Sequence, residues 1–344
     1  MQEPEKIIGD PETGGIKRLL VQARRDKVIK EILDRSRLDN KTADDVPPTI
    51  DFGRMFKPCE RAGNILDFIM NNWADEKTGL VCETWPENSD LIYTADNALL
   101  ALACIAYGWE DRTNKDAEPK YYWKAMELID NIEEHIGFYN LYNHEKCSIK
   151  TQLGSSSSYK KNITANAFLA AAYFTYTGEA LGDSMLDYLE EKVISYKDYK
   201  EGVSLVKRRD SENKDICWTF DNTAYAFACL AGRRKESLLK ILRGIHQQIG
   251  YFAMEDNARL VLKNTADPPS SELHAADSSL LSMLYFILGM NEEANQLMEG
   301  IENSIGFGIS GLVCDSSTDG ESYLLSNAAF ALALMAKEAY NAKH

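Results

Sequence analysis

The chain has 344 residues, enough for one large domain or two of ordinary size, and its 44% apolar content is that of a globular protein. Its 53 acidic and 38 basic side chains give a net charge of −15, which argues against nucleic acid or an anionic membrane as a partner because its field repels phosphate. No run of about 18 apolar residues predicts a membrane span, and no apolar secretion-signal core is present near Met1. The seven cysteines are scattered without a CxxC pair, as in a reducing compartment. We therefore expect a cytoplasmic protein.

Residues 1–50 are predicted to form an N-terminal extension to a main domain that covers residues 51–344. Within the extension, apolar residues recur at helical spacing from about Gly15 to Arg37, which predicts an amphipathic helix. A polar linker follows and ends in two prolines, Pro47 and Pro48. The sequence does not distinguish a helix packed on the outside of the main domain from a helix that binds a partner.

From residue 60 onward, the sequence alternates between two kinds of predicted helix. One kind has a single apolar stripe, which is typical of an outer layer; its members are predicted at 60–74, 120–135, 181–196, 234–248 and 291–304. The other kind is alanine-rich and apolar nearly all round, so that it must be buried on most sides; its members are predicted at 94–107, 163–177, 219–231, 275–288 and 323–340. Five successive outer and inner pairs predict an all-α fold, an (α/α) toroid of five to six helical hairpins.

The connections between these helices differ in length. Links from an inner to an outer helix are short and carry a glycine just past the last apolar turn, which is the usual C-terminal cap. Links from an outer to an inner helix are long, at about 76–93, 137–162, 200–217, 250–273 and 306–322. Some contain alternating apolar residues that predict short β-hairpins. Because loops longer than about 12–15 residues are uncommon unless functional, and each leads to a helix N-terminus with unpaired N–H groups, we expect a site on this face.

Aligning the inner helices places acids in one column, at Asp96, Asp221 and Asp277, where two repeats carry Ala165 and Ser326 instead. The next column is Asn97, Asn166, Asn222, Ser278 and Asn327. Short polar side chains favour helix starts because they accept hydrogen bonds from free N–H groups, so a structural role is the simpler interpretation of the second column. The acidic column is kept in only three repeats, which leaves catalysis or ligand contact by at least one aspartate equally open.

Acids and aromatic residues in the long loops extend the candidate site. Two carboxylates facing each other across a cleft are the minimum for glycosidic bond cleavage, and aromatic faces pack on the apolar faces of sugar rings. The candidate catalytic residues are Asp96, Asp221, Asp277, Glu83, Glu272 and Glu321. The candidate substrate-binding residues are Trp85, Tyr93, Asn97, Trp218, Asn222, His274 and Tyr323.

Other chemistry is less well supported by the sequence. His274 precedes an inner helix, with Glu272 and Asp277 nearby, and is the best candidate for proton transfer. Lysines and arginines in the long loops, Arg208 among them, suit a carboxylated or phosphorylated ligand, although charge balance with nearby acids is the simpler interpretation. Since neither HxxxH nor CxxC spacing occurs, we predict no metal site and no cofactor.

The repeated hairpins, with Asp-Asn-Ala-Leu-Leu-Ala-Leu from Asp96 at the head of an inner helix, resemble the six-hairpin glycosidase group of (α/α) toroids over residues 60–340. That group includes unsaturated glucuronyl hydrolases, glucoamylase-like enzymes, and related epimerases and lyases. In the glucuronyl hydrolase branch an acid at the start of an inner helix transfers the proton, and Asp96, Asp221 and Asp277 occupy comparable places. The epimerase branch uses histidines at inner-helix positions, and here only His274 lies near one.

The expected function is that of a carbohydrate-active enzyme, a glycoside hydrolase or close relative that uses paired carboxylates on a small saccharide, with acidic saccharides among the candidates. Two alternatives stay open. One is a non-catalytic toroid that binds a ligand or a protein. The other is a lyase or isomerase on the same fold, which requires His274 or Tyr93 near the central acids. No oligomeric state is predicted.

Overall fold

A computed structural model describes residues 38–85, 91–113, 119–138, 149–150, 152–154, 162–176, 179–209, 216–253, 260–263, 274–305, 307, 312–314 and 322–343. The helix predicted from Gly15 to Arg37 lies outside the described residues, as do the candidate acids Glu272 and Glu321.

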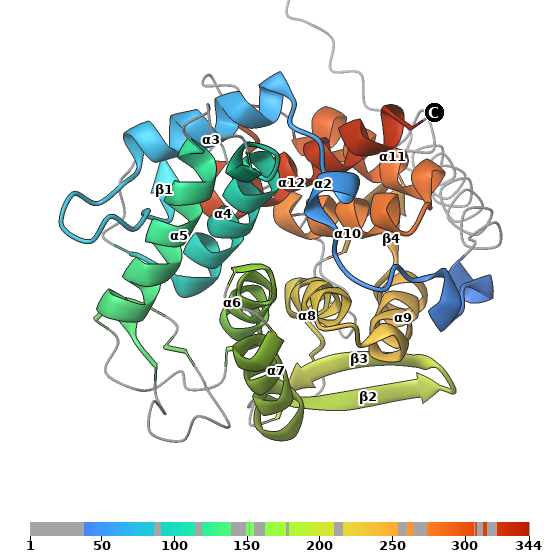
Figure 1. Cartoon of the computed structure of the whole chain (residues 1–344). Helices are drawn as coiled ribbons and strands as arrows, with labels where there is room; N and C mark the ends of the chain where they lie inside the picture. Colours follow the sequence, from blue (N-terminus) through green and yellow to red (C-terminus); the bar gives the residue numbers. More distant parts are fainter. Residues whose placement is uncertain are drawn as a thin grey trace, which may run out of the picture.

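Five alanine-rich helices surround the centre of the molecule and form the inner ring (Figure 1). They are α4 (Thr94–Tyr107), α6 (Ile163–Tyr176), α8 (Thr219–Ala231), α10 (Ala275–Ile287) and α12 (Leu324–Asn341). Alanine has the highest helix propensity, and its small side chain fits helices that are surrounded on nearly every side. In α4, every residue from Thr94 to Ala106 is buried. The ring closes because α12 packs against α4 as well as against α10.

Each outer helix covers one inner helix. Their bounds are α3 (Glu60–Asn72), α5 (Lys120–Asn131), α7 (Glu179–Tyr188), α9 (Lys235–Gly244) and α11 (Asn291–Gly300). Helices α5, α7, α9 and α11 pack on the inner helix that precedes them, whereas α3 packs on α12 and so completes the hairpin that joins the two ends of the toroid. The predicted (α/α) toroid is confirmed, and within the described part of the chain its ring closes with five hairpins.

A repeated Ile-Gly step marks where outer helices end. The last turn of these helices widens into π-helical turns at Ile132–Ile136, Leu189–Val193, Ile245–Ile249 and Ile301–Ile305. Gly137 and Gly250 follow two of these turns with φ angles of 75° and 71°. Only glycine reaches this left-handed region without steric cost, so the Ile-Gly step redirects the chain into the long loops.

Short β-hairpins and an antiparallel pair of strands from opposite ends of the chain lie in the segments that precede inner helices. The hairpins are β2 (Ile194–Lys200) with β3 (Val203–Arg208) and β4 (Tyr251–Ala253) with β5 (Leu260–Leu262), and the strands from opposite ends are β1 (Thr84–Trp85) and β6 (Ser322–Tyr323). The sequence predicted hairpins in these loops but extended the third outer helix to residue 196, which is wrong. The chain is already a strand at Ile194, because from there side chains alternate between the buried and exposed sides of the β2–β3 ribbon.

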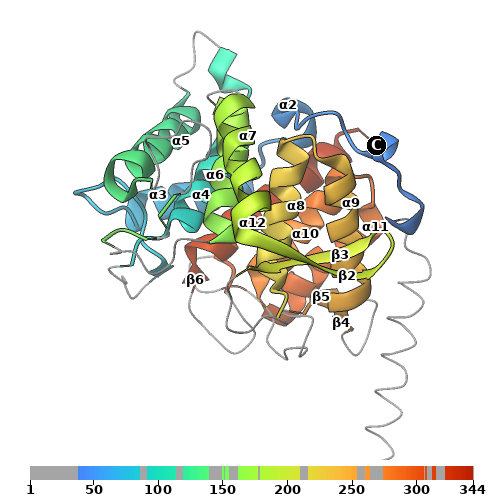
Figure 2. The same cartoon turned by 90° about the horizontal axis from the view of Figure 1, so that it is seen from below.

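The two ends of the ring differ, as Figure 2 shows. Strands β4, β5 and β6 lie at the end that we call the loop face, and the short turns and α2 (Phe52–Met55) lie at the opposite end, the turn face. A strap before α2 contains short helical turns at Leu38–Asn40 and Ala43–Asp45, and Arg243 of α9 donates to the Lys41 carbonyl at 2.5 Å. A further short turn, Asp111–Thr113, follows α4. No helix among the described residues is long and apolar enough to cross a membrane.

Candidate functional site

An asparagine in the first turn of four inner helices ties the preceding loop to the ring. The Oδ1 of Asn97 accepts from the Val81 N–H at 2.8 Å, and its Nδ2 donates to the Val81 carbonyl at 2.9 Å. The same two bonds join Asn222 to Val206 and Asn327 to Val313, and Asn166 accepts from the Ile149 N–H. All four asparagines are buried. The amides of Asn97 and Asn222 are bonded to backbone, so their predicted substrate contact stays a prediction and we leave both residues out of the proposed site.

Asp221 is also engaged within the fold. Its carboxylate accepts from Arg208 Nε at 3.1 Å and from Thr164 Oγ1 at 3.2 Å. The Asp221 side chain is 3% exposed, against 38% for Arg208. These contacts tie β3, α6 and α8 together at the loop face. They give Asp221 a structural task that the sequence did not separate from catalysis.

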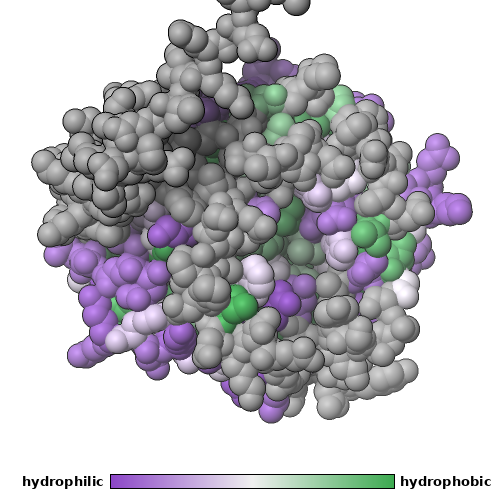
Figure 3. Space-filling view, turned by 180° about the vertical axis from the view of Figure 1, so that it is seen from behind, coloured by the Kyte–Doolittle hydropathy of each residue, from purple (hydrophilic) through white to green (hydrophobic). Residues whose placement is uncertain are grey.

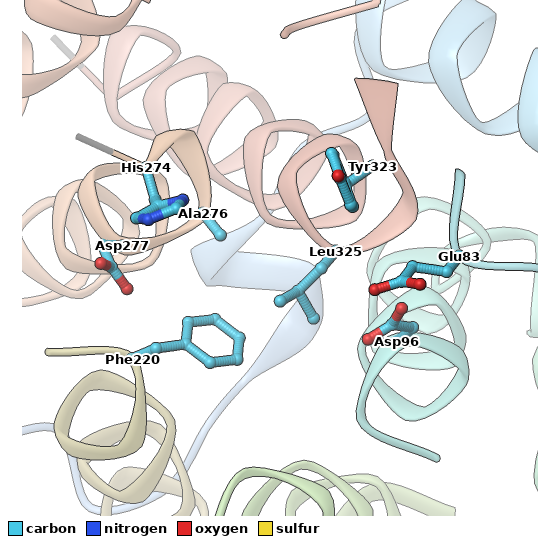
Figure 4. A pocket seen from close by; sticks show the side chains of 8 residues that line it. All are labelled: Glu83, Asp96, Phe220, His274, Ala276, Asp277, Tyr323 and Leu325. Carbon is cyan, nitrogen blue, oxygen red and sulfur yellow. The ribbon is translucent and has the colours of Figure 1, made fainter. Parts of the chain in front are cut away.

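A cavity of about 280 Å³ opens at the N-terminal ends of α4, α8, α10 and α12 (Figure 4). It is lined by Glu83, Asp96, Phe220, His274, Ala276, Asp277, Tyr323 and Leu325. Five of these eight residues are among the candidates from the sequence, and they come from both ends of the chain. Figure 3 looks onto this face, where hydrophobic residues are visible in a recess between hydrophilic ones. The cavity therefore lies on the face where the long loops predicted a site.

One wall of the cavity carries Glu83 and Asp96. Glu83 lies just before β1, where its N–H donates to the Leu91 carbonyl at 3.0 Å and its own carbonyl accepts from the Leu324 N–H at 2.8 Å. The β1–β6 pair places Thr84 opposite Tyr323, which brings that tyrosine to the same cavity. Asp96 is in the first turn of α4 and is buried. Figure 4 shows both carboxylates directed to the same side of the cavity.

The opposite wall carries His274 and Asp277. His274 has an extended backbone, with φ of −116° and ψ of 134°, and is the residue from which α10 begins. Asp277 follows in the first helical turn, where the partial positive charge of the helix N-terminus favours a carboxylate. In Figure 4 the His274 ring and the Asp277 carboxylate lie across the cavity from Glu83 and Asp96. Acidic groups therefore lie on opposite sides of the cavity, with Phe220 and Leu325 between them in this view.

Phe220 and Leu325 also line the cavity, and the sequence did not single them out. Each lies one position before the acidic column, at a place where α4 and α10 carry Ala95 and Ala276. The alignment of repeats contained a signal, because that column carries large apolar side chains in two repeats and small side chains in the other three. It was missed because neither residue carries a titratable group.

Three other candidates lie near the ends of helices or strands, and of these Tyr93 and Trp218 are not among the lining residues that the structure describes. Tyr93 precedes α4, and its backbone forms an isolated antiparallel β-bridge with Gln152. Trp218 precedes α8 and is 40% exposed. Trp85 lies in β1. Their roles in substrate binding stay predictions. Among the residues that the structure describes, no group of three His, Cys, Asp or Glu side chains is placed to hold a metal ion.

Neither a protein-family model nor a curated protein matches this chain. Solved structures do match. A family 76 glycoside hydrolase α-mannanase of Bacteroides thetaiotaomicron is 8% identical, with a TM-score of 0.50 over 86% of this chain and 97% of its own. An α-1,6-mannanase of Salegentibacter sp. is 12% identical, with a TM-score of 0.48 over 84% and 100%. A sugar epimerase from a ruminal bacterium is 15% identical, with a TM-score of 0.46 over 92% and 98%. At 8% identity and a TM-score of 0.50, the likeness to the first of these structures supports the toroid fold and no particular branch of the group.

Proposed function

We propose that this chain is a glycoside hydrolase that cleaves a saccharide between the two walls of the loop-face cavity. The observation that carries the proposal is the placement of Glu83 and Asp96 opposite Asp277 and His274 around one space. Hydrolysis of a glycosidic bond needs one carboxyl group to protonate the leaving oxygen and another to attack the sugar or to activate water. The α-mannanase that shares the fold supports the same class of reaction.

The roles follow from the two walls. A carboxyl group on one wall donates a proton to the glycosidic oxygen as the bond from that oxygen to C1 breaks. A carboxylate on the other wall, Asp277 in this assignment, either attacks C1 or removes a proton from the attacking water. His274 lies beside Asp277 and is suited to hold or transfer that proton. The net reaction adds one water across the bond.

The charge of the lining favours an uncharged saccharide over an acidic one. Glu83, Asp96 and Asp277 are acids, and among the described lining residues none is lysine or arginine. An anionic sugar entering this space meets like charges, which disfavour binding. Arg208, a basic candidate from the sequence, donates to Asp221 and is not part of the lining. We therefore rank neutral saccharides first.

A second function is favoured by His274. The isomerase alternative requires a histidine near the central acids, and His274 lines the same cavity as Asp96 and Asp277. A histidine and a carboxylate on opposite sides of a sugar carbon are suited to remove and return a proton there. This reaction leaves the number of sugar units unchanged, so it is readily separated from hydrolysis.

The test is a panel of neutral and uronic-acid oligosaccharides with both anomeric linkages, incubated with the wild-type chain in D₂O. Release of reducing ends on a neutral substrate, lost in Asp277→Asn, is the expected result. Exchange of a carbon-bound proton for deuterium without release of sugar units would transfer the assignment to the isomerase. Failure to convert any saccharide would overturn both.

A further inference from the structure

The floor of the cavity is formed by residues of α8, α10 and α12 that belong to a second column of the repeat, one position before the acidic column. That column reads Ala95, Thr164, Phe220, Ala276 and Leu325 around the ring. Phe220, Ala276 and Leu325 line the cavity. Because these residues occupy the same point of successive repeats, the size of each side chain determines how far a ligand descends into its sector. The floor is therefore higher at the large side chains of Phe220 and Leu325 than at Ala276.

The Phe220 ring is held by a neighbouring aromatic ring and by the hydrogen-bonded turn of α8 that carries it. Its edge packs against Phe168 of α6, with ring centroids 5.7 Å apart and planes at 63°. Phe168 is fully buried. The next two residues of α8 are fixed as well, Asp221 by Arg208 and Asn222 by Val206. A half-buried aromatic ring on so constrained a turn loses little conformational entropy when a ligand packs on it.

Figure 4 shows the direction of this ring. It points into the cavity from the side of Asp277 toward Leu325, beneath the space between the two acidic walls. The walls offer carboxylates to hydroxyl groups, whereas the floor offers apolar surface. A sugar ring has the matching division, with hydroxyls at its edge and C–H groups on its faces.

We propose that Phe220 is a substrate-positioning residue that packs against the C–H face of a sugar ring and fixes the height of the scissile bond between the walls. The proposal rests on the function proposed above, because it assigns a saccharide to the same cavity. The unit bound over Phe220 is an uncharged pyranose ring. Leu325 supplies a second apolar contact on the floor.

The experiment compares three substitutions on the preferred substrate. Phe220→Leu keeps apolar volume and removes the aromatic face, whereas Phe220→Tyr keeps the ring. Phe227→Leu is the matched control, because it makes the same change in a fully buried residue two turns further along α8. We expect Phe220→Leu to lower kcat/KM by roughly 10-fold, the scale of one aromatic packing contact, mainly through KM. Phe220→Tyr, which keeps the ring, and Phe227→Leu, which is not among the lining residues, are expected to stay within about 3-fold, or about 0.65 kcal/mol.

A binding measurement keeps this proposal separate from the hydrolase assignment. Calorimetric titration compares the affinity of two variants for one oligosaccharide, Asp277→Asn and the double variant Asp277→Asn with Phe220→Leu. The oligosaccharide is the one of the panel that the wild-type chain converts fastest. If the wild-type chain converts none, it is the one that the wild-type chain binds most tightly. If saccharides bind but are not cleaved, and Phe220→Leu weakens binding about 10-fold, positioning by Phe220 stands and hydrolysis fails. Equal affinity of both variants, or an equal loss of kcat/KM in Phe227→Leu, overturns the role of Phe220. Absence of binding by any saccharide overturns both proposals.

Discussion

Two sectors of the ring place the same repeat position in different surroundings. Between α6 and α8, Asp221 is bonded to Arg208 and to Thr164. On the other side of the ring, Asp96 and Asp277 occupy the equivalent turns of α4 and α10 and line a cavity. All three aspartates are buried at a helix start, so position in the repeat alone does not decide their role. The neighbouring loop does.

In the α8 and α4 sectors, where residues of the segment before the helix are described, that segment brings a charged side chain to the region of the aspartate. In the α8 sector, β3 ends at Arg208, whose guanidinium neutralises Asp221. In the α4 sector, the loop instead brings a second acid, Glu83, to the cavity that Asp96 lines. An opposite charge produces a structural ion pair, whereas a second acid beside an open space produces the equipment for acid–base chemistry. Substitutions in either sector test this difference, because they are expected to change turnover in one sector and stability in the other.

Removing a cavity carboxylate is expected to have the largest effect. Asp96→Asn and Asp277→Asn should each lower kcat by about 10²–10⁴-fold, the usual contribution of a positioned acid or base, with little change in Tm. Asp221→Asn should do the reverse and lower Tm while kcat falls less than about 10-fold, or 1.4 kcal/mol. Steady-state kinetics and thermal unfolding of the three variants check this. Loss of turnover in Asp221→Asn alone would reverse the assignment of the two sectors.

The asparagine column should matter for stability in both sectors alike. Asn222→Ala leaves the N–H and carbonyl of Val206 without their side-chain partner. Each buried group deprived of its bond costs roughly 1–3 kcal/mol, so we expect a total near 3 kcal/mol from urea unfolding. Asn327→Ala, which frees Val313 beside the cavity sector, should cost about the same. A cost below about 0.5 kcal/mol, the lower bound for one hydrogen bond, would contradict the structural role.

Breaking the ion pair should cost somewhat less. Arg208→Met leaves the buried Asp221 carboxylate without its guanidinium, and removal of one partner of a fully buried pair costs roughly 3–5 kcal/mol. Because the Arg208 side chain is 38% exposed, solvent screens part of this, and we expect about 2 kcal/mol. A double-mutant cycle with Asp221→Asn isolates the pair. Additive effects in that cycle would show that the two charges do not interact.

The smallest effect is expected from alkaline pH. Burial raises the pKa of the Cys104 thiol in α4 from 9.0 to about 12. Burial likewise raises the pKa of Tyr225 in α8 well above its ordinary 10.0, and its hydroxyl lies 2.7 Å from that of Tyr196 in β2. Both groups favour the neutral form when folded, so their contribution is fully present below pH 9.0 and is lost as pH rises above it. Tm should be flat from pH 7 to 8.5 and fall by pH 10.5; a rise would contradict this.

Much of the fold was predictable from the sequence, because alanine-rich and striped helices differ in apolar pattern over many residues. The face on which the cavity lies was also predictable, because the loops on that face are much longer than the turns on the other. The contacts of individual side chains were not predictable, since Asp96 and Asp221 both follow a Thr-x step and precede an asparagine, and within that stretch differ only in Ala95 against Phe220. Only the path of β3 shows that Arg208 reaches Asp221. Likewise, the amides of Asn97 and Asn222 find their partners sixteen residues away, beyond the reach of a helical pattern.

The central claim is that the cavity between the two acidic walls binds the saccharide. The most direct test is a crystal structure of Asp277→Asn soaked with the preferred neutral oligosaccharide. We predict sugar density between Glu83 and Asp96 on one side and residue 277 on the other, with one ring above Phe220. A second cavity lies at the turn face and is lined by Thr175 and Arg233 among others. Sugar density at that cavity or elsewhere, with the loop-face cavity empty, would contradict the claim.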